Sequence, residues 1–177
     1  MSHLKTIEQR LLWLSHWMIH HANHLRVKED AIKVGGHQAS SASMVSIMTA
    51  LYFSALRPED RVAVKPHASP VFHAMQYLMG NLSREKMENF RGYGGVQSYP
   101  SRTKDVDDVD FSTGSVGLGV AMTSFASIIQ DFVTGNLKSL IGPKNPNGLA
   151  WINMILHHPY SIRINVKTNN FNFLSKF

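Results

Sequence analysis

The segment FSTGSVGLG, Phe111–Gly119, is the most informative stretch of the chain. Three glycines and three small hydroxyl residues lead straight into an apolar run with helical periodicity, which predicts a helix over Gly119–Val133. A helix N-terminus offers free N–H groups and glycine lets an anion approach the backbone, so the pattern favours a phosphate site. A tight turn with close helix packing is the alternative, and the GxxxxGK[ST] pattern of a P-loop is absent.

Two further segments each place one histidine among small residues. In GGHQASSAS, Gly35–Ser43, His37 follows two glycines and precedes a helix predicted over Ser40–Leu56. In KPHASP, Lys65–Pro70, His67 lies in a predicted loop with proline on both sides, which restricts the backbone. A histidine held in this way can donate to a phosphate or act as an acid or base. An ordinary packed turn is the alternative for both segments.

A fourth segment, FRGYGGVQSYPS, Phe90–Ser101, is rich in glycine and ends in Tyr99-Pro100-Ser101. We expect an irregular loop there, and an ordinary surface turn is the alternative to a functional role. The remaining predicted elements are a helix over Leu4–Arg26, a strand over Arg61–Val64, a helix over Val71–Met79, a short helix from Ser83 to near Arg91, and an exposed acidic stretch over Val106–Asp110.

In this order, the four segments resemble the thiamine-diphosphate-dependent enzymes of the transketolase and 2-oxo acid dehydrogenase kind. That family shows a Gly-His pair before a small-residue helix, a GHAS(P) loop, a Pro-Ser loop, and STGSxGxG opening a helix. The counterparts here are Gly36-His37, His67–Pro70, Tyr99–Ser101 and Ser112–Gly119. The resemblance runs from about residue 4 to residue 133. Near residues 90–100 and 124–133 the sequence is more similar to the homodimeric first component of pyruvate dehydrogenase complexes than to transketolase.

The resemblance implies an α/β fold, a central parallel sheet with helices on both faces, of which this chain spans only the first strands. We therefore expect a partial, helix-rich thiamine-diphosphate-binding domain with an incomplete parallel sheet. The implied catalytic residues are His37 and His67. The implied cofactor-binding residues are His67, Tyr99, Gly114, Ser115 and Val116.

The sequence departs from the family at two places in these segments. Transketolases carry histidine at the position of Tyr99, which argues against sugar-phosphate chemistry, because tyrosine is a poor acid or base at neutral pH. Pro66 stands where the family usually has glycine.

The cofactors implied by the resemblance are thiamine diphosphate and Mg²⁺, but the sequence assigns no metal ligand. The family holds the cation with a Gly-Asp turn and an asparagine, and magnesium prefers oxygen ligands. Asp131 is the last acidic residue and no Gly-Asp pair occurs, so we treat Asn169-Asn170 as a coincidence. The second domain of the family, which provides the glutamate that activates the cofactor ring, is missing too. We expect the chain alone to be inactive and to need a homodimer or a complementary subunit.

Three functions stay open at this point. The chain is a fragment or subunit of an enzyme acting on 2-oxo acids or ketose phosphates, an inactive remnant of one, or a non-enzymatic interaction module. An incomplete sheet leaves apolar surface uncovered, which favours self-association or low solubility.

Composition and charge limit the other possibilities. The chain has 177 residues, no cysteine and a net charge of +6, which predicts one globular domain without disulfides or thiolate sites. No run reaches the length of a membrane span, so we expect a cytoplasmic protein that binds no membrane. Residues 134–177 carry five basic and no acidic residues, so the body has no basic stripe and nucleic-acid binding is not expected.

The same shift in composition divides the chain. Residues 1–133 form the predicted domain, and residues 134–177, with eight asparagines, form a divergent or non-native tail produced by truncation, a frameshift or divergence.

His16, His20 and His24 repeat at helical spacing but cannot easily converge on one ion, so we interpret them as a helix face. The methionine pairs Met44/Met48 and Met75/Met79 are expected in the core.

Overall fold

The computed structural model describes residues 3–29, 32–57, 60–114, 116–136, 151–156 and 162–166. In chain order its elements are α1 (His3–His20), the π-helical turn η1 (His21–Leu25), α2 (Gln38–Ala42), α3 (Val45–Ala50), the π-helical turn η2 (Leu51–Ala55), β1 (Arg61–Ala63), the 3-10 turn η3 (Pro66–Ala68), α4 (Ser69–Leu78), α5 (Arg84–Glu88), α6 (Leu118–Asn136), β2 (Trp151–Leu156) and β3 (Ile162–Val166).

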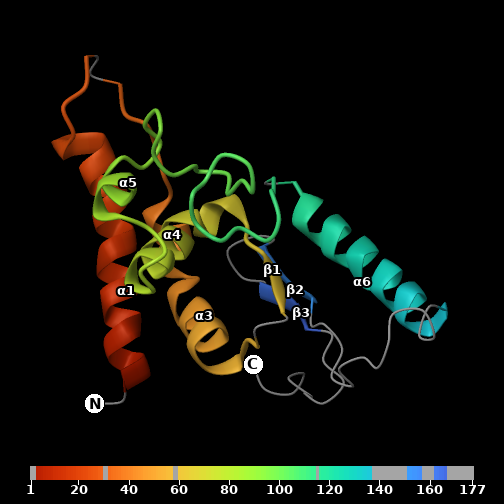
Figure 1. Ribbon diagram of the computed structural model, residues 1–177. Coiled ribbons are helices and arrows are strands. Elements are labelled where there is room, and N and C mark those ends of the chain that lie inside the picture. The colour runs from red at the N-terminus through yellow and green to blue at the C-terminus, as the bar shows by residue number, and fades with distance from the viewer. Residues whose placement is uncertain are drawn as a thin grey trace.

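The core forms where α1 and α3 pack against α4 (Figure 1). Leu11, Leu14 and Met18 of α1 recur at helical spacing and are buried, while the exposed side of α1 carries polar residues together with Leu12 and Trp13. Eight of the ten residues of α4 are buried, which makes it the central helix of the fold. Burial of this apolar stripe is the main stabilising contribution to the helical part.

The predicted core methionines are mostly confirmed. Met44, Met48 and Met75 are at most 1% exposed and belong to one continuous hydrophobic cluster. Met79 follows the end of α4 and is 47% exposed, so its assignment to the core is wrong.

The predicted helix over Ser40–Leu56 is broken into α2, α3 and η2. The Ser43 hydroxyl donates to the Ser40 carbonyl at the turn between α2 and α3, and the Thr49 hydroxyl donates to the Val45 carbonyl. Such side-chain donors compete with the helical backbone and bend it. The predicted boundaries are close, but the continuous helix is wrong.

The predicted loop over Pro66–Pro70 is helical instead. Pro66 opens η3 and Pro70 lies in the first turn of α4. Proline suits the start of a helical turn, because its fixed φ is helical and its missing N–H would have no intrahelical acceptor there. The two prolines therefore begin helices rather than bound a loop.

The strands lie between the α1–α4 group and α6 (Figure 1). β1 pairs in parallel with β2, and β2 pairs antiparallel with β3. The helix-rich character expected from the sequence is present. A central parallel sheet with helices on both faces is not shown by the described residues, so the α/β assignment holds only in part. Of the tail after residue 134, the structure describes the end of α6 and the backbone of β2 and β3.

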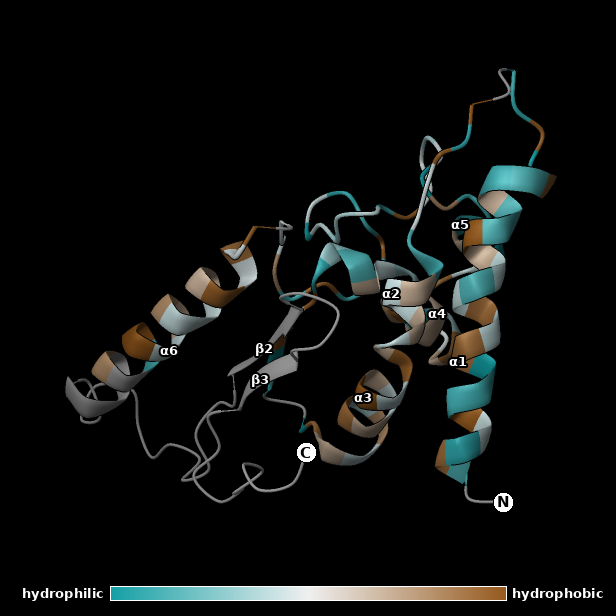
Figure 2. Ribbon diagram, turned by 180° about the vertical axis from the view of Figure 1, so that it is seen from behind, coloured by the Kyte–Doolittle hydropathy of each residue, from teal (hydrophilic) through white to brown (hydrophobic). Residues whose placement is uncertain are grey.

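One face of α6 is apolar and exposed. Its exposed large side chains include Phe125, Ile128, Ile129 and Phe132. Figure 2 shows this hydrophobic colouring along α6. In the described part of the chain, no helix is long and apolar enough to cross a bilayer.

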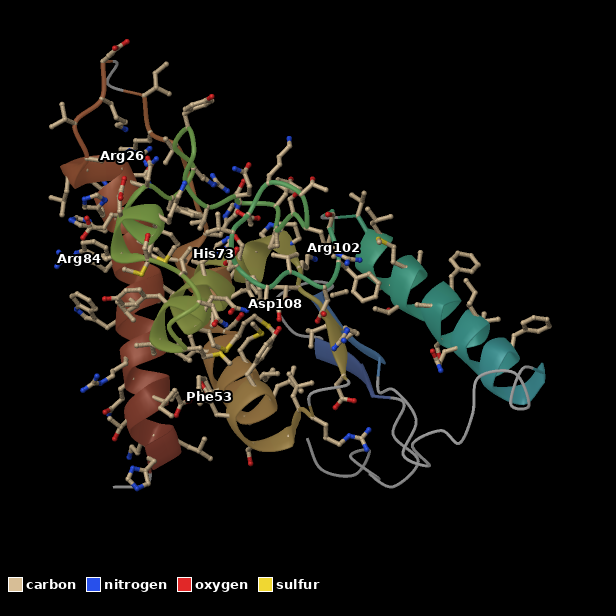
Figure 3. The ribbon with its side chains drawn as sticks, viewed as in Figure 1. Arg26, Phe53, His73, Arg84, Arg102 and Asp108 are labelled. Carbon is tan, nitrogen blue, oxygen red and sulfur yellow. The ribbon has the colours of Figure 1, made fainter. Side chains whose placement is uncertain are left out.

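The predicted exposed acidic stretch at Val106–Asp110 is only partly exposed: Val106 and Asp108 are exposed, but Asp107 and Val109 are buried and Asp110 is half-buried. Asp107 is 6% exposed, and its Oδ2 lies 2.5 Å from Nδ1 of His73 in α4 (Figure 3). Asp110 accepts a hydrogen bond from the Val62 N–H at 2.8 Å, and Asp105 accepts from the N–H groups of Gln97 and Ser101. Backbone N–H groups and a buried histidine bind one or both oxygens of each of these three carboxylates, while Oδ1 of Asp107 is buried without a partner among the described residues.

His73 joins α4 to two different parts of the loop from Gln97 to Asp110. Its Nε2 donates to the Gln97 carbonyl at 2.7 Å, and its Nδ1 faces Asp107. Because a carbonyl can only accept, Nε2 carries a proton, and one further proton is shared between Nδ1 and the carboxyl group. Both side chains are fully buried, so each depends on the other for a hydrogen-bond partner.

Removing the Asp107 carboxyl group should therefore destabilise the fold strongly. We expect Asp107→Ala to lower the free energy of unfolding by about 3 kcal/mol, because it leaves a buried imidazole without its partner. Urea unfolding followed by circular dichroism measures the loss. Asp108→Ala, at an exposed neighbour, is the control and should stay within about 0.5 kcal/mol of the wild type. Equal stability of the two variants would show that the buried pair does not support the fold.

Candidate functional site

The two predicted catalytic histidines lie side by side. The rings of His37 and His67 have their centroids 5.0 Å apart and are tilted by 36°. His37 directly precedes α2, and His67 lies in η3 just before α4. The packing of α2 against η3 and α4 thus brings together two segments separated by 30 positions.

The two glycines before His37 are needed for this approach. Gly35 and Gly36 have φ of +77° and +126°, which side-chain-bearing residues rarely adopt. A Cβ on Gly36 would also lie 2.9 Å from the side chain of Ile19 in α1. The chain therefore passes close to α1 and then turns His37 toward His67.

His67 is poised to be neutral at physiological pH. Burial lowers the pKa of its imidazole, and His37, Lys65 and Arg91 lower it further. Its Nδ1 is buried and has no hydrogen-bond partner among the described residues. A neutral imidazole with one unused nitrogen can accept or donate a proton to a molecule bound beside it.

Thr113, at the start of the glycine-rich turn, is tied to the same place. Its hydroxyl donates to the Val64 carbonyl, three residues before His67. Its N–H donates to the Pro100 carbonyl at 3.4 Å, which connects the turn to the Tyr-Pro-Ser loop. Thr113 thus links the turn before α6 to the loop at Tyr99–Ser101 and to Val64, in the segment that leads into His67.

The predicted cofactor-binding residues of the turn differ in exposure. Gly114 is half-buried, and Val116 is 91% exposed. Gly117 has φ of +85° with open space around it. Tyr99 is 52% exposed. Ser115 lies outside the described residues.

Arg91 is a candidate that the sequence did not reveal. It has a φ of +57°, and its Nη1 donates to the Val34 carbonyl at 2.5 Å, next to the glycine pair. With Tyr99 it lines a surface cavity of about 400 Å³. Arginine in a glycine-rich stretch has no distinctive pattern, and only the neighbouring Gly92, Gly94 and Gly95 hinted at an unusual backbone.

Metal ligands do not gather in the described part of the chain. No group of three or more histidine, cysteine, aspartate or glutamate side chains there could hold an ion. The rings of His20, at the end of α1, and His24, in η1, stack with centroids 5.0 Å apart, and His16 donates from Nδ1 to the Leu12 carbonyl. This arrangement agrees with their interpretation as a helix face.

The environment of His67 can be tested by titration. Because its folded pKa is lowered, protonation favours the unfolded chain, and the stability contributed by neutral His67 is lost as the pH falls below about 6.5. In a proton NMR titration, the His67 ring should titrate below pH 6.5. Lys65→Gln removes a nearby positive charge and should raise the His67 pKa toward its ordinary value. The matched control Lys104→Gln should leave it unchanged. A His67 pKa at or above 6.5 in the wild type would contradict this account.

Comparison with known proteins adds a relationship to these observations. The chain is 30% identical to the "Pyruvate dehydrogenase E1 component" of Mycobacterium tuberculosis over 118 residues, which is 60% of this chain and 12% of that protein. It is 36% identical to the protein of the same name from Pseudomonas aeruginosa over 126 residues, 64% of this chain and 14% of that one. It is 33% identical to the protein of the same name from Escherichia coli K12 over 104 residues, which is 54% of this chain and 12% of that one. No protein-family model matches the chain.

These relatives are much longer than the present chain, which spans about an eighth of their length. Over somewhat more than half of its own length, the chain is similar to the E1 component of pyruvate dehydrogenase.

Proposed function

We propose that this chain forms part of the cofactor-binding domain of a thiamine-diphosphate-dependent enzyme that acts on 2-oxo acids. The observation that carries the proposal is the close approach of His37 and His67, with Thr113 tied to Val64 beside them. The similarity to pyruvate dehydrogenase E1 components supports the 2-oxo acid class. Tyr99, where transketolases have histidine, argues against a ketose phosphate.

The residues present suit the organic part of the cofactor. His67 offers a buried, unpartnered Nδ1 and a neutral ring, which suits a heteroaromatic ring or a substrate carbonyl. The turn before α6 suits a diphosphate, because Gly117 has an open, left-handed backbone just before the start of a 19-residue helix. Three phosphate-friendly features, glycine, hydroxyl groups and helix N–H groups, lie within Ser112–Val120.

The residues present do not suit the divalent cation. The described part of the chain holds no cluster of metal ligands, and no carboxylate follows Asp131 in the sequence. A diphosphate binds Mg²⁺ through its own oxygens and a small number of protein carboxylates. In this proposal the cation ligands come from a complementary chain.

The roles of the residues follow from their surroundings. Thiamine diphosphate, when bound, supplies carbanion stabilisation for cleavage next to a carbonyl. Neutral His67 holds or accepts a proton at Nδ1, and His37 borders the same space from the α2 side. The Tyr99 phenol donates a hydrogen bond but does not act as a base at neutral pH.

A second candidate function is an interaction module. The observation that favours it is the apolar face of α6, where Phe125, Ile128 and Ile129 are each more than 60% exposed. Exposed apolar patches of this kind mark association surfaces. The two functions are compatible if the partner that covers α6 also completes the site.

Calorimetric titration of the full chain with thiamine diphosphate tests the first proposal. We expect weak binding, with a Kd on the order of 1 mM, because the described part of the chain supplies no ligand set for the divalent cation that accompanies the diphosphate. Adding Mg²⁺ should not tighten it. His67→Ala should weaken the binding further, and His16→Ala on the exposed face of α1 is the matched control.

Two results would overturn the proposal or its metal argument. Absence of any heat or NMR shift at His67 with several millimolar cofactor would remove thiamine diphosphate as the ligand. Tight binding that depends on Mg²⁺ would show that this chain alone holds the cation.

A further inference from the structure

A polar cavity lies next to the segment that carries His37. It has a volume of about 400 Å³ and is lined by Val34, Arg91, Gly92, Gln97, Ser98 and Tyr99. The lining contains one cation, two hydroxyl groups and an amide, and no carboxylate. Its composition thus has a positive charge without a matching negative one.

The loop that presents Arg91 is tightly folded. The Arg91 N–H donates to the Val96 carbonyl at 3.0 Å, which closes a loop of six residues. A Cβ on Gly92 or on Gly95 would lie within 2 Å of atoms of Asn89, so neither position admits a side chain. This close packing holds Arg91 at its left-handed φ of +57°, a conformation that costs free energy for a residue with a long side chain. Strain of this kind concentrates at ligand sites.

The guanidinium of Arg91 is only partly satisfied. Nη1 donates to the Val34 carbonyl, and the group lies 5.4 Å from the centre of the Phe90 ring. Nε is buried and has no partner among the described residues, and no carboxylate of that part of the chain forms an ion pair with Arg91. Burial lowers the pKa of Arg91, and the only opposing influence comes from Tyr99. A desolvated cation without a counter-charge is costly, and an anionic ligand would offset that cost.

We infer that this cavity binds a small carboxylate, with Arg91 as the group that takes the anion and Tyr99 and Ser98 as hydroxyl donors. The planar guanidinium matches the two oxygens of a carboxylate. A phosphate dianion is less suited, because the lining has a single cation.

The identity of the carboxylate as that of a 2-oxo acid rests on the proposed function. Arg91 lies within electrostatic reach of His67, since its charge contributes to the lowered pKa of that ring. Arg91 acts here as a binding and specificity residue.

The test is an NMR titration of the full chain that follows the arginine Nε–Hε resonances. Sodium pyruvate is the probe, sodium chloride at equal ionic strength is the blank, and inorganic phosphate is the competing anion. Pyruvate should shift the Arg91 resonance, and Arg91→Gln should raise its Kd at least tenfold. Arg84→Gln carries the same substitution at an arginine on the outer side of the molecule (Figure 3), and should leave the Kd unchanged.

Three outcomes would overturn the inference. They are pyruvate failing to shift Arg91, phosphate binding more tightly than pyruvate, or Arg91→Gln binding pyruvate as well as the wild type does. If melting shows that Arg91→Gln does not fold, Tyr99→Phe replaces it, and a Kd at least threefold higher supports the site while an unchanged Kd contradicts it.

A parallel titration with thiamine diphosphate separates this inference from the proposed function. Pyruvate binding without any response to the cofactor would retain the carboxylate site and remove the proposed function. Cofactor binding without a pyruvate response would do the reverse.

Discussion

The fold of the central region depends on one buried side chain, His73. It lies at the middle of α4 and is satisfied on one ring nitrogen by Asp107 and on the other by the Gln97 carbonyl. A buried imidazole nitrogen without a hydrogen-bond partner would destabilise the fold by more free energy than most single contacts contribute. The loop must therefore supply both partners. The loop from Gln97 to Asp110 is thereby held against α4. Asp105 organises its interior, and Asp110 fastens its end to β1 through Val62.

The candidate site is a consequence of that constraint. Once the loop is held against α4 and β1, Pro100 and Val64 become the hydrogen-bond acceptors of Thr113, and the turn before α6 is brought to the segment that leads into His67. The glycines before His37 complete the arrangement from the other side, because they let the chain pass Ile19 closely. Interior polar contacts, rather than the site residues themselves, thus set the distances among the four sequence segments. The backbone of Arg91 is set separately, by its hydrogen bond to Val96 and by the packing of Gly92 and Gly95 against Asn89.

The sequence predicted part of this arrangement, for identifiable reasons. Helical periodicity is a strong local signal, so it predicts α4 and α6 with nearly correct boundaries, and it predicts as one helix the stretch that forms α1 and the π-helical turn η1. Glycine and histidine mark the segments that meet. The position of the acidic residues could not be predicted, because the inward direction of Asp107 depends on His73, 34 positions away. The start of α4 was missed because proline was interpreted as a breaker, although its place in the first helical turn favours initiation. Arg91 was missed because its left-handed backbone is imposed by packing around Asn89, and the sequence alone does not show such packing.

The central claim is that two histidines from separate segments lie side by side in the folded chain. A two-dimensional NOE spectrum of the full-length protein in its native state tests it most directly, using the ring protons of His37 and His67. With centroids 5.0 Å apart, the two rings should give a direct cross-peak, and His37→Ala should abolish it while the His67 resonances remain dispersed. Absence of that cross-peak in a well-folded sample would show that the two segments do not meet, and the shared site would have to be abandoned.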